Sequence, residues 1–316
     1  MSFSSEVKEE LTKIAVKDSE QRTAELVGFM ISNCVVTPEY GEYILKMSTE
    51  NEYAIRRLYT FFKAQYNIVG KTNVERPKRP DVLPLYHMKI SDKASLKILF
   101  EKCAININEK LQIILSDKNV ITQNEECKRA FLRGIFLGTG SVVNPDSRYH
   151  LEIVINNQEN ALLVNEIMES FEINSKMIKR KKDYIIYIKL AESISTFLAV
   201  VGANQGTIKF EEARVIKEVR NNINRVSNFE NANFDKTVDA SLIQIEDINL
   251  LKKNKKFSKL PSHLKEIAKL RITYKEATFE ELGKMLEPNL SRAGVSHRFK
   301  KIHELAEEFR KNSQES

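Results

Sequence analysis

The sequence contains no tryptophan, and only three cysteines, ten glycines and seven prolines occur among its 316 residues. Cys34, Cys103 and Cys127 stand far apart without paired spacing, which excludes a disulfide framework and predicts a reducing compartment. They form no Cys/His cluster, so we expect no structural zinc. No apolar run approaches the roughly 18 residues of a membrane span, and the acidic start is unlike a signal peptide. These absences predict a cytoplasmic protein without a membrane partner.

The residues that are present suit a globular chain of more than one domain. Hydrophobic residues make up 42% of the sequence and charged residues 29%, which allows real cores and argues against disorder. The net charge of +7 is unevenly spread, since residues 252–316 hold 16 Lys+Arg against 9 Asp+Glu, whereas residues 1–251 hold 34 of each. This concentration predicts that the C-terminal segment meets a polyanion, although a basic segment that only aids solubility would look the same.

Two stretches of the sequence repeat one order of predicted elements. Each begins with a helix that contains Leu-x-Gly, at Leu26 to Gly28 and at Leu132 to Gly134, and continues with two strands, a helix, two strands and a helix. The glycines lie 106 residues apart, and Leu45 and Leu151 keep the same offset. We therefore predict an α+β fold of two αββαββα repeats, at about residues 20–105 and 126–205, with two four-stranded antiparallel sheets related by a pseudo-twofold axis.

This duplicated helix resembles the motif of the LAGLIDADG homing endonucleases. Gly28 and Gly134 would allow two helices to cross closely, because glycine has no Cβ. In that family the eighth motif position carries an acid that binds the catalytic metal, but here it is Asn33 in one copy and Thr139 in the other. Neutral side chains are poor ligands for a divalent metal. We expect no enzyme activity, no catalytic residue, no cofactor and no metal.

Basic residues recur in the loops between the third and fourth predicted strands of the two repeats. They are Arg76, Lys78 and Arg79 in the first, and Lys179, Arg180, Lys181 and Lys182 in the second. In active relatives such loops belong to a saddle over the duplex, so the resemblance implies a possible DNA contact. The balanced charge of residues 1–251 fits solvated turns equally well.

Beyond residue 205 the pattern becomes helical. We assign residues 1–205 to the LAGLIDADG-like domain, 206–258 to a helical linker with an Asn-rich break at 228–233, and 259–316 to a small all-helical domain. Thr278 to Glu281 form a capping box, and Pro288 ends the helix that follows. Ser291 then caps a second helix that runs to about Lys311. We predict a helix-turn-helix whose second helix enters the major groove of DNA.

The outer face of this second helix supplies the candidate DNA contacts. Its inner stripe is apolar, at Val295, Phe299, Ile302, Ala306 and Phe309. We expect Arg292, Ser296 and His297 to reach base edges, and Arg298, Lys300, Lys301 and the amide end at Ser291 to contact phosphates. An ordinary helical hairpin with a solvated face has the same spacing, but the concentrated charge favours DNA binding.

Long segments of the chain resemble the WhiA family, and the resemblance extends over essentially the whole length. They are MSFSSEVKEEL, RAFLRGIFLGTGSV, YHLEIV, NRVSNFENANFDKTVDA and LSRAGVSHRFKKI. The resemblance implies a nucleoid-associated bacterial transcription regulator that binds double-stranded DNA, with a degenerate LAGLIDADG domain and a helix-turn-helix. It further implies links to cell division, the cell cycle, chromosome segregation and sporulation, and other regulatory proteins as partners. The alternative is a catalytically silent scaffold that acts mainly through protein partners at the nucleoid.

Overall fold

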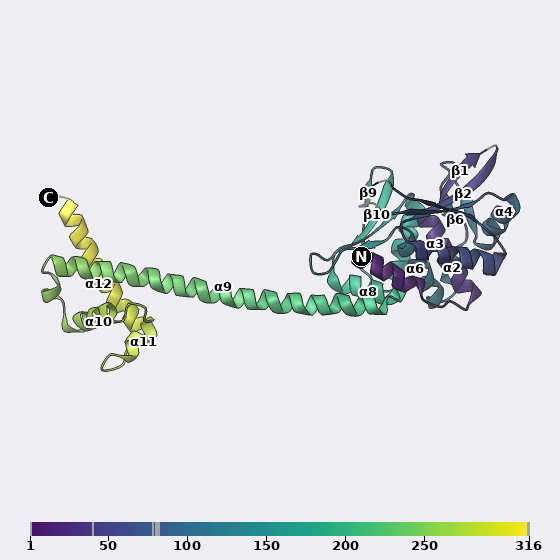
Figure 1. Ribbon diagram of the computed structural model, residues 1–316. Coiled ribbons are helices and arrows are strands. Elements are labelled where there is room, and N and C mark those ends of the chain that lie inside the picture. The colour runs from purple at the N-terminus through teal and green to yellow at the C-terminus, as the bar shows by residue number, and fades with distance from the viewer. Residues whose placement is uncertain (1, 40, 78, 80–82, 315–316) are drawn as a thin grey trace. The chain divides into compact units, whose positions relative to one another are not determined.

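A computed structural model describes residues 2–39, 41–77, 79 and 83–314 (Figure 1). The chain forms two compact units, Met1–Glu218 and Val219–Ser316. No helix in the described ranges is long and apolar enough to cross a membrane. The domain boundaries expected at residues 205 and 258 stay a prediction.

The first unit contains the two repeats. The first repeat comprises α2 (Ser19–Asn33), β1 (Val35–Glu39), β2 (Glu42–Thr49), α3 (Glu52–Tyr66), β3 (Lys71–Glu75), β4 (Leu85–Ile90) and α4 (Lys93–Lys102). The second comprises α6 (Glu125–Thr139), β7 (Ser141–Val142), β8 (Leu151–Ile155), α7 (Gln158–Glu169), β9 (Lys176–Arg180), β10 (Asp183–Ile188) and α8 (Ala191–Val201). The sheets have the equivalent orders β1-β2-β4-β3 and β7-β8-β10-β9, and all their pairs are antiparallel. The predicted α+β fold with duplicated sheets is confirmed.

Helices α2 and α6 cross at their glycines. A Cβ added to Gly28 would lie 2.2 Å from the backbone oxygen of Phe131, and one added to Gly134 would lie 2.0 Å from that of Glu25. Glu25 and Phe131 are also 106 residues apart, so each glycine meets the repeat equivalent of the residue that its counterpart meets. This reciprocity is what a pseudo-twofold axis between the helices requires, and glycine is needed at both positions.

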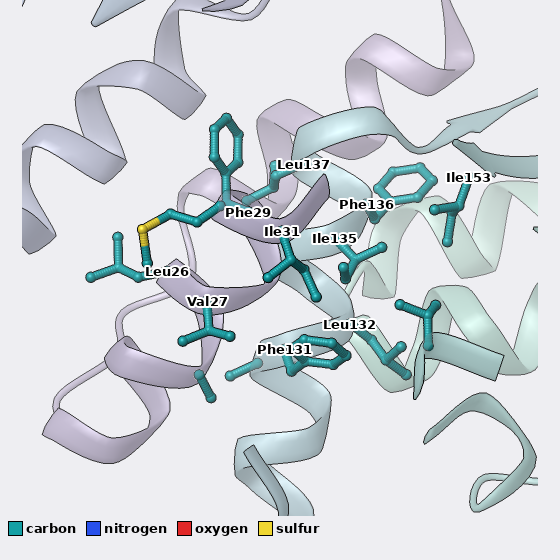
Figure 2. Packing of buried hydrophobic residues seen from close by; sticks show 14 of the residues in the cluster. Leu26, Val27, Phe29, Ile31, Phe131, Leu132, Ile135, Phe136, Leu137 and Ile153 are labelled. Atoms are coloured by element: carbon teal, nitrogen blue, oxygen red, sulfur yellow. The ribbon is translucent and has the colours of Figure 1, made fainter. Parts of the chain in front are cut away.

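The core of the first unit forms around this crossing (Figure 2). Both helices contribute large side chains that are almost completely buried, among them Phe29, Phe131 and Phe136, and Ile153 of β8 packs nearby. The three cysteines are buried free thiols in the same core. Burial raises the pKa of the Cys103 thiol to about 12 and that of Cys34 well above its usual value, so these thiols stay protonated at neutral pH.

A charged cluster is buried beside the crossing. The Glu25 carboxylate accepts hydrogen bonds from Nη2 of Arg57 on α3 at 2.9 Å and from Nε of Arg133 on α6 at 2.9 Å. Arg57 also donates to the carbonyl oxygens of Thr12 and Ile14, and Arg133 donates to that of Val201. The side chains of all three charged residues are at most 8% exposed. One anion thus compensates two cations, and Arg57 joins the cluster to the end of α1 (Phe3–Thr12) and to the residues after it.

Three elements between the repeats were not predicted: β5 (Ile105–Ile107), β6 (Ile113–Leu115) and α5 (Asn119–Thr122). The expected break at 228–233 is wrong, because α9 (Asn204–Lys253) runs through it as one helix of 50 residues (Figure 1). Residues 207–260 contain neither glycine nor proline, and the weak helix propensity of asparagine alone does not stop a helix.

Candidate nucleic-acid interface

In the second unit, three helices pack against the C-terminal end of α9. They are α10 (Ser262–Thr273), α11 (Phe279–Lys284) and α12 (Arg292–Gln314), and a 3-10 turn, η1 (Phe257–Lys259), precedes them. Their shared core is apolar and includes Ile248 and Leu251 of α9, and it further contains Leu260, Leu264, Ile267, Ala268, Leu282, Leu286, Val295, Phe299, Ile302 and Ala306. The predicted inner stripe of α12 is therefore buried, except that Phe309 is only partly covered.

The turn between α11 and α12 is fixed by local contacts. The capping box at Thr278 is present in both directions, since Thr278 Oγ1 accepts from the Glu281 N–H and the Glu281 carboxylate accepts from the Thr278 N–H. Gly283 lies against the returning chain, where a Cβ would be 2.1 Å from the carbonyl oxygen of Leu290. The Leu290 N–H donates back to the carbonyl of Gly283 at 3.0 Å. These contacts set the angle at which α12 leaves the turn.

The candidate DNA contacts fall on two kinds of position. Ser296, His297 and Lys300 are exposed on the outer side of α12, and within the described part of the chain their side chains have no hydrogen-bond or ion-pair partner. Ser291 caps the helix by accepting from the Gly294 N–H at 3.3 Å. Arg292 is exposed in the first turn.

The other two cations are engaged within the second unit. Arg298 donates to the carbonyl oxygen of His263 at 3.2 Å and lies 3.8 Å from the Glu266 carboxylate, both on α10. Lys301 pairs with Glu304 at 3.5 Å, but it remains 61% exposed. Arg298 would have to break its contacts with α10 to bind a phosphate. Lys301 would give up only an exposed ion pair with Glu304, which stabilises the fold little.

A charged cluster that the sequence analysis missed ties α12 to α9. Asp247 on α9 is 1% exposed, and its carboxylate lies 2.7 Å from Nδ1 of His303 and 2.8 Å from Nη2 of Arg310. These partners are more than fifty residues away in the sequence, so no spacing rule could have connected them. The cluster joins the C-terminal half of α12 to α9.

The two positions that carry acids in homing endonucleases have a structural role here. Asn33 Nδ2 donates to the carbonyl oxygens of Ser48 at 2.9 Å and Gly138 at 3.2 Å, and its Oδ1 accepts from the Ser48 N–H at 3.1 Å. Thr139 Oγ1 donates to the carbonyl oxygen of Val154 at 2.7 Å. Ser48 and Val154 are themselves 106 residues apart, so both side chains bind equivalent points of β2 and β8.

This donor set does not fit a divalent metal. An amide nitrogen and a hydroxyl that both donate to backbone carbonyls present hydrogens where a metal would need anionic oxygen. Within the described ranges, no group of three or more His, Cys, Asp or Glu side chains could hold a metal ion.

Replacing Asn33 with aspartate should therefore destabilise the protein instead of restoring a metal site. The carboxylate would face two carbonyl oxygens without a proton to donate, at a cost of about 1–3 kcal/mol near pH 7. These carbonyls should raise the pKa of the new carboxyl in the folded state. The unfolding free energy of the variant is then highest when this carboxyl is protonated, below its unfolded-state pKa of about 4. It falls as the pH rises through the higher pKa of the folded state. Urea unfolding at pH 4 and pH 7 measures this, with the exposed Asn106→Asp as control; equal stability of Asn33→Asp and wild type at pH 7 would contradict it.

Two lysines of the first sheet share one carboxylate, whereas the cations predicted between the third and fourth strands of each repeat are exposed. Lys46 and Lys89 both bind the Glu39 carboxylate at 3.0 Å, and hydrogen bonds from Lys89 and Lys46 lower the pKa of Glu39. Arg76, Arg79 and the four cations at 179–182 are exposed, whereas Lys78 lies outside the described residues. Lys179 and Arg180 lie in β9 and not in the predicted loop, and both segments stay candidate DNA contacts.

Fold and interface together define a LAGLIDADG-like unit followed by a helix-turn-helix. Three family models match in sequence: the WhiA N-terminal LAGLIDADG-like domain at residues 19–103, the WhiA LAGLIDADG-like domain at 128–220, and the WhiA C-terminal HTH domain at 223–306. The chain belongs to the WhiA family.

Relatives along the full length agree with this assignment. The "Probable cell division protein WhiA" of Bacillus pumilus is 39% identical over 319 residues, and the match covers 98% of each chain. The protein of the same name from Clostridium botulinum (strain Hall) is 36% identical over 313 residues, covering 98% of this chain and 99% of the relative. Among solved structures, full-length DUF199/WhiA from Thermotoga maritima matches with a TM-score of 0.59 and 26% identity over 98% of this chain and 99% of that one.

Proposed function

We propose that this protein is a sequence-specific, DNA-binding transcription regulator whose activity is linked to cell division, chromosome segregation and sporulation. The observation that carries the proposal is the outer face of α12, where Ser296, His297 and Lys300 are exposed while the inner face is fixed in the core. A helix held in this way enters a major groove without first having to become ordered. The names of the relatives, which refer to cell division, support the biological link.

The proposal assigns different roles to the residues of this face. Ser296 and His297 reach base edges, whereas Lys300 and Lys301 contact phosphates, as does the amide end of α12 at Ser291. The regulator works at the nucleoid in the cytoplasm and performs no phosphodiester chemistry, since Asn33 and Thr139 do not suit a catalytic metal. Other regulatory proteins are its further partners.

These roles are tested by measuring the affinity of the protein for selected DNA fragments. Fragments are first selected from a genomic pool by the full-length protein, and affinity is then measured by mobility shift as a function of salt. We expect His297→Ala to reduce the preference for the selected sequence over a shuffled one by about 1–3 kcal/mol. Lys300→Ala should weaken binding to both sequences equally and reduce the salt slope by about 0.9.

The matched control is Lys97→Ala, which removes an exposed cation from α4 of the first unit and should leave both quantities unchanged. A flat salt response of the wild type, or full selectivity in His297→Ala, would speak against the proposal. Such a result would favour the alternative of a silent scaffold that acts through protein partners.

A further inference from the structure

A cavity in the second unit lies beside the first turn of α12. Its volume is about 550 Å³, and its wall combines side chains of α9 with residues at the end of α10 and at the starts of α11 and α12. Three cations line it, Lys236, Arg271 and Arg292, together with the rings of Phe229 and Phe279. Among the candidate DNA contacts on α12, Arg292 lines this cavity, whereas Ser296, His297 and Lys300 do not.

Arg271 is the most unusual member of this wall, because it is a buried cation whose contacts are all neutral. Its side chain is among the largest fully buried ones, at 1% exposure. Nε donates to Oε1 of Gln244 at 2.9 Å, and Nη1 donates to backbone carbonyl oxygens, the shortest contact being 2.6 Å to Ala277. The guanidinium also lies over the rings of Phe299 and Phe279, 5.3 and 5.9 Å from their centroids.

No carboxylate compensates this charge within the described part of the chain, and Nη2 has no hydrogen-bond partner there. Burial lowers the pKa of Arg271 to about 10, which leaves it fully charged at neutral pH. Buried charges in proteins are normally paired, so an unpaired one at the wall of a cavity points to a counter-ion from outside the chain.

The rim of the cavity strengthens this conclusion. Lys236 on α9 and Arg292 on α12 are both exposed, and in the described ranges neither lies within ion-pair distance of a carboxylate. The hydrogen bond and charge of Lys284, and after them the charge of Arg292, lower the pKa of Glu280. The single carboxylate of the wall, Glu280, is bound by Lys284 at 2.8 Å. The cavity therefore combines three cations with one carboxylate that already has a partner, and its field favours an anion.

We propose that this cavity binds a phosphate group, held by Arg271 from within and by Lys236 and Arg292 at the rim. A planar guanidinium and flexible cations recognise the oxygens of phosphate well, and the volume lies in the range of small-ligand sites. The DNA backbone is the source that the position of Arg292 favours, because this residue opens the helix proposed to read DNA; that part rests on the proposed function. A free phosphorylated ligand is the other source of the same group.

The sequence contains no tryptophan, so a tryptophan introduced at the cavity reports on this site alone. Phe229 is 68% exposed at the cavity, so Phe229→Trp introduces a single fluorescent reporter there without disturbing the core. Inorganic phosphate, and separately a selected DNA duplex, are titrated into the full-length reporter protein at constant ionic strength, with chloride as reference. Lys236→Gln and Arg292→Gln are made in this background, since changing the buried Arg271 could prevent folding. Lys269→Gln, an exposed cation of α10 outside the cavity wall, is the control.

We expect a saturable response to phosphate that each rim variant weakens about tenfold and that Lys269→Gln leaves unchanged. If DNA is the source, each rim variant also weakens duplex binding and lowers its salt slope by about 0.9. If duplex binding does not change while phosphate binding does, a free ligand is the source. The absence of a saturable response to phosphate and to DNA, or an equal response in all variants, would overturn the phosphate site. The proposed DNA-binding role would then still stand if His297→Ala lowers selectivity in the mobility shift, and it would fail separately if it does not.

Discussion

Replacing Glu25 with alanine is expected to cost the first unit about 3–5 kcal/mol of unfolding free energy. The change leaves Arg57 and Arg133 buried side by side without their shared anion. Both arginines are also held by backbone carbonyl oxygens, so neither can turn to solvent without losing those hydrogen bonds. The penalty is mainly that of two uncompensated charges, and the loss of one carboxylate's contacts adds to it.

Urea unfolding followed by circular dichroism measures this loss. Glu101→Ala is a suitable control, because its carboxylate is 62% exposed and 3.9 Å from Lys97, and such a surface pair contributes about 0–1 kcal/mol. A triple variant, Glu25→Leu with Arg57→Met and Arg133→Leu, should recover a large part of the loss, because it removes the cations as well. If the triple variant is less stable than Glu25→Ala alone, packing and not charge is the main contribution of the cluster.

Gly134→Ala should be about as damaging, with an expected loss near 3 kcal/mol, at the upper end of the overpacking range. The added methyl would lie 2.0 Å from the carbonyl oxygen of Glu25 and 2.9 Å from the Phe29 nitrogen, both of which are backbone atoms. Backbone cannot rotate away as a side chain can, so α2 and α6 must move apart and open the core around Phe29 and Phe131.

Thermal and urea unfolding of the single and double variants test this geometry. Gly28→Ala should cost a similar amount, since its methyl would lie 2.2 Å from the carbonyl oxygen of Phe131. The double variant should lose less than the sum, because helices already moved apart at one contact have room at the other. Gly206→Ala is the control, since its methyl would lie 2.9 Å from the end of the Val7 side chain and 3.5 Å from Ala203 Cβ and Glu10 Oε2, all of which are side-chain atoms. Full additivity of the two losses would contradict a shared crossing.

The sequence predicted the parts of the fold that depend on short-range patterns. The alternation of apolar residues predicted strands of both sheets, and the Leu-x-Gly helices predicted the helix crossing. The pair Thr278 and Glu281 predicted the start of α11. The predicted break in the Asn-rich segment is wrong, because the weak helix propensity of asparagine does not prevent a helical backbone there. The short strands β5 and β6 carry too few residues for a periodic signal.

The candidate site could be predicted only in part from the sequence. Which face of α12 is exposed follows from the spacing of Val295, Phe299 and Ile302, and the structure buries that stripe. That Arg298 binds α10, and that Arg271 and Lys236 line one cavity, depends on contacts between residues far apart in the chain. Spacing says nothing about such contacts, so these residues became visible only in the folded chain.

Gly28 and Gly134 make equivalent contacts with opposite helices, and this bears on the origin of the two repeats. In an ancestor with a single copy of the repeat, two identical subunits would have met at this point, and one glycine codon would have served both contacts. After fusion of the copies, each glycine codon specifies only one of the two backbone contacts. The two halves could then diverge independently, provided that glycine stayed at both points where their backbones touch.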